Sequence, residues 1–554
     1  MIKKLLIDIL KKELKGDVQL KVTPSPDLGD YCLECFKLSK DQPPEEFAKQ
    51  LAKRLEGKIK IVKRIEAMGS YLNFFLNKSF VAGLVIKKIL NQKEKYGSTN
   101  IGNGKKILIE HTSINPNASP HVGRARNAIL GDSIVRLFRF QGYLPEVHYF
   151  VNDVGKQIAM LVFGAKGKKL RFENLLQIYI NTNKQIKDKP ELEAEIFGLL
   201  KKFEDGDKKT IRRFNHVVKI CVNGQRKILE EFGICYDYFD YESKYLWGKT
   251  DDILKRFKRT KHIFVDEHKR NVLDLAGLIA NSPILVLTRG DGTSLYPLRD
   301  TAYTIDKLKR AKKNVIILGE DQKLYFQQLG AALSLLKLTA PEVVHYSFVL
   351  ISEKGQKEKM STRQGNLVLL EDFMSEAVKK AGIEIKKRER INSKQLKRFS
   401  RIIGYGAIKY TILKVSPDKN ITFDWSSALS FEGDSAPYVQ YAYVRAVSIL
   451  KKAKRNEKKN IDFGTLTAPE EFALIKELST FQEKVKEAST QLKPHLIVSY
   501  LSSLAKCFSD FYQNCQCLTA EADLRNARLE LVKAASYVLK SGLNLLGINA
   551  PEKM

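Results

Sequence analysis

The stretch KILIEHTSINPNASPHVGRARNAILGDSIVRLFRF, residues 106–140, decides the fold of this chain. Its first five residues carry the signal of a short buried strand. A polar loop follows, and from about His121 to Phe140 apolar residues recur at helical spacing. A buried strand that passes through a loop into a helix is the opening of a strand–helix–strand unit, so the stretch indicates a parallel sheet covered by helices.

The alternation of strands and helices continues beyond this stretch. Further strand candidates are residues 284–287, 315–318 and 345–351, and helical patterns separate them. The mostly helical and charged residues 153–245 interrupt the alternation, which indicates an insertion. We therefore expect a Rossmann-like, doubly wound parallel sheet in residues 96–415, with a helical insertion at about 153–245.

The two ends of the chain differ from this central part, and 554 residues exceed what one hydrophobic core usually supports. Residues 1–95 mix helical and strand patterns, and the aromatic-rich run 69–76 suits a strand. Beyond about residue 416 strand signals nearly vanish, while amphipathic helices such as 437–453 and 523–546 continue to the end. The sequence thus predicts a multidomain α/β protein with an α+β N-terminal domain at 1–95 and an all-α C-terminal domain at 416–554.

The composition points to a nucleic-acid partner. Lys and Arg number 95 against 63 Asp and Glu, a formal net charge of +32, and a surface of that sign attracts polyphosphates. A lysine-rich bias shared by all proteins of the source organism is the alternative. No apolar run approaches the roughly 18 to 20 residues of a membrane span. The seven cysteines are scattered, so we expect reduced thiols, a cytoplasmic location and no membrane partner.

The first chemical motif is His121-Val-Gly-Arg124, at the start of the predicted helix. A helix start points backbone N–H groups and the positive end of the helix dipole outward, which suits phosphate. His121 can donate a hydrogen bond to a phosphate oxygen, and Gly123 lets a flat ligand approach the backbone. Taken alone, such a histidine is more often plain polar surface.

The second motif is Lys359-Met-Ser-Thr-Arg-Gln-Gly-Asn366, a loop with two cations and a glycine. Mobile cations of this kind can close over a triphosphate and offset the charge that builds on a leaving pyrophosphate. An ordinary basic surface turn is the alternative.

Together the two motifs resemble the His-Ile-Gly-His and Lys-Met-Ser-Lys-Ser signatures of class I aminoacyl-tRNA synthetases. Within that class the surroundings resemble arginyl-tRNA synthetases, from the catalytic fold to the last residue, and the N-terminal region is similar to the extra domain of that family. The stretches that carry the resemblance are 110–115, 125–132, 149–157, 296–300, 359–366, 423–445 and 547–554.

The resemblance implies ATP-dependent activation of L-arginine and its transfer to tRNA(Arg). Arginine's guanidinium is planar and permanently charged, so its pocket needs carboxylates and acceptors. Asp300 is the implied guanidinium partner and Asn115 holds the backbone end; an ion pair with Arg299 or a helix cap is the alternative for Asp300. The full implied arginine pocket is Glu110, Ser113, Asn115, Tyr296, Asp300 and Gln322. The implied catalytic and ATP-binding residues are His121, Gly123, Arg124, Lys359, Met360, Ser361 and Arg363, with Mg²⁺ on the phosphates.

The resemblance also assigns residues to tRNA. Tyr438, Tyr441 and Arg445 fall on one face of a helix in the C-terminal domain, where rings can stack on unpaired anticodon bases. Half-buried packing is the alternative for such a stripe. The family adds Met554 near the anticodon, and it adds Tyr71 and Asn73 as contacts to the D-loop. Members of the family are usually monomers, and we expect a monomer here.

Two departures from the signatures stand out, and no upstream lysine compensates for them. Arg124 replaces the second histidine and Thr362 replaces the second lysine, and Ala118 stands where some members carry a compensating lysine. A catalytically impaired tRNA-binding paralogue, or another class I synthetase, therefore stays open as an alternative. Cys32 and Cys35 have metal-like spacing without a second pair, so no structural metal is expected.

Overall fold

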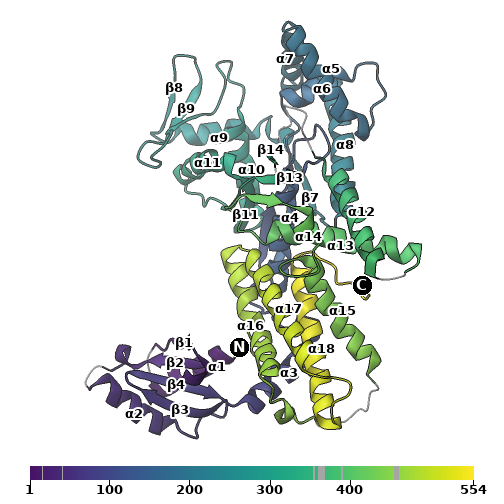
Figure 1. The fold of residues 1–554 in the computed structure, drawn as a ribbon. Helices are drawn as coiled ribbons and strands as arrows, with labels where there is room; N and C mark the ends of the chain where they lie inside the picture. Colours follow the sequence, from purple (N-terminus) through teal and green to yellow (C-terminus); the bar gives the residue numbers. More distant parts are fainter. Residues whose placement is uncertain are drawn as a thin grey trace.

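The computed structural model describes residues 1–14, 17–39, 42–353, 356–359, 368–388, 391–453 and 461–553. An N-terminal sheet domain, a central α/β domain and a helical bundle follow one another along the chain (Figure 1). The bundle lies below the α/β domain in this view, and the N-terminal domain extends from it to one side. This arrangement confirms the multidomain α/β architecture predicted from the sequence.

The N-terminal domain is built on an antiparallel sheet of strand order β1-β2-β4-β3. The second helix packs on β3 and β4, and the predicted strand at 69–76 is β4. A further helix, α3 (Lys78–Gln92), leads to the centre and packs against the bundle. The elements are α1 (Ile2–Leu14), β1 (Leu20–Val22), β2 (Tyr31–Glu34), α2 (Pro44–Leu55), β3 (Val62–Met68) and β4 (Tyr71–Leu76).

The central domain contains a five-stranded, fully parallel sheet of order β12-β11-β5-β6-β7. The chain starts at β5 in the middle, moves to one side through β6 and β7, and later returns to the other side through β11 and β12, which is the doubly wound pattern. The strands are β5 (Lys106–Glu110), β6 (Leu144–Val151), β7 (Tyr238–Tyr241), β11 (Lys313–Gly319) and β12 (Glu342–Tyr346).

Helices cover both faces of this sheet. Successive side chains of a strand point to opposite faces, and here Glu110 contacts Lys307 of α10 (Tyr296–Arg310) while His111 lies against Gly131 of α4 (Val122–Phe140). The helix α4 and the helix α10 therefore cover opposite faces. A third helix, α11 (Lys323–Leu335), follows β11.

Two strand expectations were wrong in detail. Residues 284–287 form β10 (Ile284–Val286), which pairs antiparallel with β9 (Asn271–Asp274) in a separate sheet completed by β8 (Ile263–Val265). An apolar run indicates a strand, but it does not show to which sheet the strand belongs. The run 345–351 divides between β12 and β13 (Val349–Glu353), because the buried guanidinium of Arg126 binds the backbone carbonyl of Ser347 at 2.6 Å.

The helical insertion ends earlier than the expected residue 245. It consists of α5 (Lys156–Gly164), α6 (Phe172–Asp188), α7 (Leu192–Glu204) and α8 (Lys208–Glu231). The strand that follows, β7, pairs with β6 and so belongs to the parallel sheet. A short 3₁₀ turn, η4 (Glu242–Tyr245), and the helix α9 (Lys249–Lys258) come next.

The C-terminal part begins with a small sheet of order β14-β13-β15, made with β14 (Gln356–Lys359) and β15 (Ile421–Phe423). The helices after it are α12 (Leu370–Arg388), α13 (Ser393–Leu413), α14 (Trp425–Ala428), α15 (Ala436–Lys452), α16 (Pro469–Gln491), α17 (His495–Asn514) and α18 (Ala522–Leu545). The end of α18 docks on α4, since Ser133 donates a hydrogen bond to the carbonyl of Leu545. Across the described ranges, no helix has the length and apolarity that a membrane crossing requires.

Candidate active site

A cavity of about 320 Å³ opens at the carboxyl ends of β5, β6 and β11. The strand order reverses between β5 and β11, and crevices at such switch points are where open α/β sheets bind ligands. The six residues predicted for the arginine pocket all line this cavity: Glu110, Ser113, Asn115, Tyr296, Asp300 and Gln322. They come from three separate segments of the chain, so the fold brings together what the sequence had only suggested.

Asp300 lies on α10, deep in the cavity, and the hydroxyl of Tyr325 donates a hydrogen bond to it. Burial raises the pKa of Asp300 to about 6, with a further increase from the charge of Glu110. The alternative ion pair is not formed: Arg299 binds Glu242 instead, at 2.6 Å. Nor is Asp300 a cap, because the residue before the helix is Leu295.

Two other carboxylates line the cavity, and each has its own cation. Glu110, at the end of β5, is buried and accepts a hydrogen bond from the ammonium of Lys307 at 2.6 Å. Glu242 is paired with Arg299. Within the described part of the chain, Asp300 is therefore the lining carboxylate that has no cation at ion-pair distance, which leaves it available to a cationic ligand.

Glu242 is a lining carboxylate that the sequence did not reveal. It begins the 3₁₀ turn η4 directly after β7, and it is only 3% exposed. Burial raises its pKa to about 7, although the charge of Arg299 opposes the increase. The signal that could have found Glu242 is its place directly after a strand, but that strand, β7, was not predicted from the sequence.

The loop after β5 is held in an unusual conformation. Thr112 and Ser113 have positive φ angles of 78° and 42°, which costs of order 1 to 3 kcal/mol for each such residue. Buried side chains fix the loop: Asn127 accepts from the Thr112 N–H at 2.7 Å, and Gln225 of α8 donates to the carbonyl of Asn115 at 3.1 Å. The inserted helix α8 thus shapes the wall of the cavity.

The first signature motif occupies the start of α4. His121 precedes the helix without capping it through its side chain, and burial together with the charge of Arg124 lowers the pKa of His121 to about 4. The imidazole is therefore neutral near pH 7. A Cβ added to Gly123 would lie 3.1 Å from two atoms of this ring, so the glycine makes room for His121 itself. Arg124 is half-buried and lines the cavity.

The backbone at the end of the second signature segment lies against the first. The Val122 N–H donates to the carbonyl of Val368 at 3.1 Å, and the Leu370 N–H donates to the carbonyl of Pro120 at 2.7 Å. The side chain of Lys359 lies outside the described residues, as do Met360, Ser361 and Arg363.

The residues assigned to tRNA lie far from this cavity along the chain. In the N-terminal domain Tyr71 is 41% exposed, whereas Asn73 is buried and donates to the sulfur of Met68. On α15 the guanidinium of Arg445 lies over the ring of Tyr441 at 4.3 Å, and Tyr438 is half-buried in the same helix. Met554 lies outside the described residues.

Metal-binding side chains do not gather in the described ranges. No group of three or more His, Cys, Asp or Glu residues there could hold an ion. Cys32 and Cys35 are buried free thiols at β2.

Comparisons with known proteins cover the whole chain. Residues 1–76 match the arginyl tRNA synthetase N-terminal domain, residues 85–425 the catalytic domain of class I (R) tRNA synthetases, and residues 439–554 the DALR anticodon-binding domain. The arginine–tRNA ligase of Methanocaldococcus jannaschii is 35% identical, over 99% of this chain and 98% of that protein. The enzyme of Methanocella arvoryzae is 38% identical, with 94% and 92% covered.

Solved structures agree with these relatives. Arginyl-tRNA synthetase of Thermus thermophilus has a TM-score of 0.84 and 27% identity, with both chains covered completely. A methionyl-tRNA synthetase of Mycobacterium tuberculosis, at a TM-score of 0.52 and 14% identity, shares the fold alone. The sequence, the cavity and these matches lead to one conclusion: the chain belongs to the arginyl-tRNA synthetase family, in class I of the aminoacyl-tRNA synthetases.

Proposed function

We propose that the chain carries out the arginine–tRNA ligase reaction of its family in the cavity at the carboxyl ends of β5, β6 and β11. Arginine is activated with ATP to arginyl-adenylate and then transferred to the terminal ribose of tRNA(Arg). The observation that carries this proposal is the convergence of six sequence-predicted residues on one cavity, in which Asp300 is a carboxylate without a cationic partner among the described residues.

The guanidinium of arginine is placed against Asp300 in this proposal. Glu242 adds a second acceptor nearby, and the half-exposed ring of Tyr296 forms a wall, 4.8 Å from the ring of Tyr325. A pocket that pairs a buried acid with a guanidinium rejects a neutral or shorter side chain, because its own polar groups would stay unpaired. The ammonium and carboxylate groups of the substrate would then be bound by the remaining lining residues Asn115, Ser113, Gln322 and Glu110.

The phosphates of ATP are assigned to the start of α4. His121, Gly123 and Arg124 lie there, and the helix dipole favours negative charge at this point. Lys359, Met360, Ser361 and Arg363 complete the proposed site from the second signature. Activation needs no nucleophilic side chain: the substrate carboxylate attacks the α-phosphorus, and the protein aligns the reactants and stabilises the charge that spreads over the phosphates.

Mg²⁺ is the proposed metal of the reaction. No group of three or more His, Cys, Asp or Glu among the described residues is placed to hold an ion, so phosphate oxygens are its proposed ligands, and the ion would neutralise phosphate charge there. Oxygen ligands from phosphate suit this cation, which keeps several waters.

The tRNA is assigned to the two flanking domains. We infer that the N-terminal domain, residues 1–95, contacts the D-loop through Tyr71 and Asn73. The helical domain, residues 416–554, would recognise the anticodon through Tyr438, Tyr441, Arg445 and Met554. The central residues 96–415 hold the chemistry. We infer further that the chain acts as a monomer in the cytoplasm.

Pyrophosphate exchange with each amino acid, with and without tRNA, tests the proposed function. We expect exchange with arginine alone and only when tRNA(Arg) is present, since relatives need tRNA for activation. Exchange with a different amino acid would assign the chain to another specificity. Salt-sensitive tRNA binding with no exchange at all would identify a non-catalytic paralogue in which Arg124 and Thr362 have ended the chemistry.

A further inference from the structure

The helix α10 meets the parallel sheet through a polar stripe. Asp300, Tyr303, Lys307 and Arg310 recur at intervals of three and four residues, so they share one face of the helix. The neighbouring strands present acidic and imidazole side chains to this face: Glu110 on β5, and Glu146 and His148 on β6. Helices usually cover a parallel sheet with apolar side chains, so the exception points to a function.

Lys307 is the centre of the stripe. Its side chain is 3% exposed, and its ammonium lies 2.6 Å from Glu110 Oε2. The same ammonium lies 4.2 Å from the centre of the Tyr303 ring, where an aromatic face attracts a cation. A buried ammonium is tolerated only with partners of this kind, because its loss of hydration is costly.

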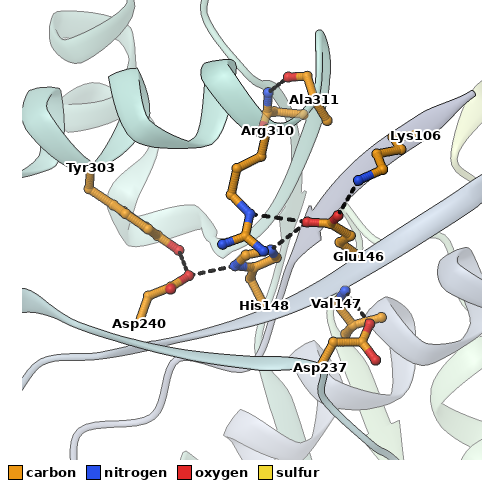
Figure 2. Close-up of polar contacts among 10 residues, drawn as sticks. Lys106, Glu146, Val147, His148, Asp237, Asp240, Tyr303, Arg310 and Ala311 are labelled. Atoms are coloured by element: carbon orange, nitrogen blue, oxygen red, sulfur yellow. Dashed lines mark hydrogen bonds and ion pairs between the residues drawn. The ribbon is translucent and has the colours of Figure 1, made fainter.

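Tyr303 is itself fixed on both sides. Its ring stacks on Phe150 at 4.8 Å, and its hydroxyl donates to Asp240 Oδ2 at 2.9 Å. Asp240 also contacts His148 Nδ1, as Figure 2 shows. Burial opposes the ionised form of Asp240, yet the hydrogen bonds from His148 and Tyr303 hold its pKa below the ordinary value.

His148 connects these contacts to the cavity, because it lies beside Glu110 in the sheet. His148 and Glu110 are paired in the β5–β6 register, so they are cross-strand neighbours on the same face. The His148 ring stacks on the Tyr238 ring, with 4.7 Å between their centres. The guanidinium of Arg310 also lies over the Tyr238 ring, 3.9 Å from its centre. Buried, mutually supporting contacts of this type hold each side chain in one position.

We propose that Lys307 is a positioning residue for arginine: it fixes the Glu110 carboxylate at the inner wall of the cavity, and Tyr303, Asp240 and His148 fix Lys307. The inference deepens the proposed function and rests on it. Among the described residues, Glu110 is paired with Lys307 and Glu242 with Arg299, which leaves Asp300 as the lining carboxylate without a cation at ion-pair distance. Lys307 thereby keeps Glu110 from competing with Asp300 for the guanidinium.

Loss of the ammonium has a specific consequence for the charges in the cavity. Glu110 would remain a buried acid with no cation, and burial beside another acid raises a carboxyl pKa. The titratable groups that face it are Lys307, Asp300 and Tyr303 on α10, Tyr245 on η4, and His148 on β6. Arginine binding would then depend on one more acid-sensitive group, in addition to Asp300 and Glu242.

The variant Lys307→Met tests the inference, with Lys309→Met as the matched control. Lys309 lies on the same helix but is exposed and pairs with Asp306 at the surface. In tRNA charging we expect KM for arginine to rise about tenfold or more in Lys307→Met, because one partner of a buried charge pair is lost. KM for ATP should stay within about twofold. The control should match the wild type, and only Lys307→Met should show the additional acid-sensitive step in the arginine pH profile.

Two further variants separate positioning from folding. Tyr303→Phe removes only the hydroxyl that binds Asp240 and should raise KM for arginine about threefold without changing KM for ATP. The neutral pair Lys307→Met with Glu110→Gln should recover the melting temperature lost in Lys307→Met, yet keep the raised KM for arginine. A folded Lys307→Met enzyme whose arginine KM equals that of the wild type, or a double variant that restores this KM, would overturn the inference. If the wild type itself fails to charge tRNA with arginine, the proposed function fails instead.

Discussion

Replacing Asp300 with asparagine removes one charge from the cavity and changes its shape very little. The hydroxyl of Tyr325, which donates to Asp300 in the wild type, retains an oxygen acceptor in the amide. Glu110 and Glu242 keep their own cations, so neither is free to replace the lost charge. The substitution therefore isolates the electrostatic contribution of one carboxylate to the binding of a guanidinium.

The size of the effect follows from this arrangement. Removing one partner of a buried, hydrogen-bonded charge pair costs about 2 to 5 kcal/mol. Asp300 is reached from the cavity and is only partly shielded from water, so a value of about 3 kcal/mol is appropriate, which is about a 150-fold loss in kcat/KM for arginine. KM for ATP should change by less than about twofold, because the phosphates are assigned to the start of α4.

Steady-state charging of tRNA(Arg) with arginine and ATP varied in turn measures both constants. Asp306→Asn is the control, since Asp306 lies on the same helix and pairs with Lys249 and Lys309 outside the cavity. Burial raises the pKa of Asp300, so its ionised form destabilises the empty protein at pH 8; the variant should accordingly melt no lower than the wild type. An equal rise in the KM values for ATP and arginine, or a fall in kcat/KM for arginine below about fivefold, would refute the assignment.

Two further results are expected. In the proposed site arginine binds the ionised forms of Asp300 and Glu242, whose pKa values are raised to about 6 and about 7, so KM for arginine should be flat above about pH 8 and more than about tenfold higher at pH 5; a profile unchanged by Asp300→Asn would contradict this origin. Gly123→Ala places a Cβ 3.1 Å from the His121 ring. The displaced imidazole should raise KM for ATP about tenfold, while KM for arginine stays constant. Pyrophosphate exchange with each substrate varied in turn measures both values, and a raised KM for arginine with an unchanged KM for ATP would contradict the prediction.

The sequence predicts those helices and strands in which the buried positions are apolar and recur at a regular spacing. The helices expected at 437–453 and 523–546 are α15 (Ala436–Lys452) and α18 (Ala522–Leu545), shifted by a single residue. Both are long, and each buries one apolar face, so the helical period is visible over several turns. The strand, loop and helix of residues 106–140 are recognisable for the same reason.

The strands β6 and β7 were not predicted because polar side chains interrupt their apolar pattern. Glu146 and His148 lie within β6, and Asp240 lies within β7. Their partners are on α10, more than 50 residues away along the chain: Arg310 for Glu146, and Tyr303 for Asp240. Only the folded chain shows that Glu146 and Asp240 find partners inside, so the run LPEVHYFV does not look like a buried strand in the sequence.

The candidate site likewise contains residues that the sequence could predict and residues that it could not. Residues inside recognisable motifs, such as Asn115 and Asp300, could be assigned to the pocket from the sequence. Glu242 could not, because it follows the unpredicted strand β7. Lys307 could not either, since a lysine on an amphipathic helix is normally exposed, whereas this one is buried against Glu110.

The polar packing of α10 links these missing pieces to specificity. Apolar side chains in place of Lys307 and Glu110 would pack at least as stably, because a buried ion pair rarely exceeds a hydrophobic contact in net stabilisation. Such a wall would leave nothing to orient a charged substrate. Local rules of sequence and structure are broken mainly where function requires it, and here they are broken along the helix that carries Asp300. The residues that hide β6 and β7 from the sequence pattern are thus among the ones that we propose hold the arginine pocket in place.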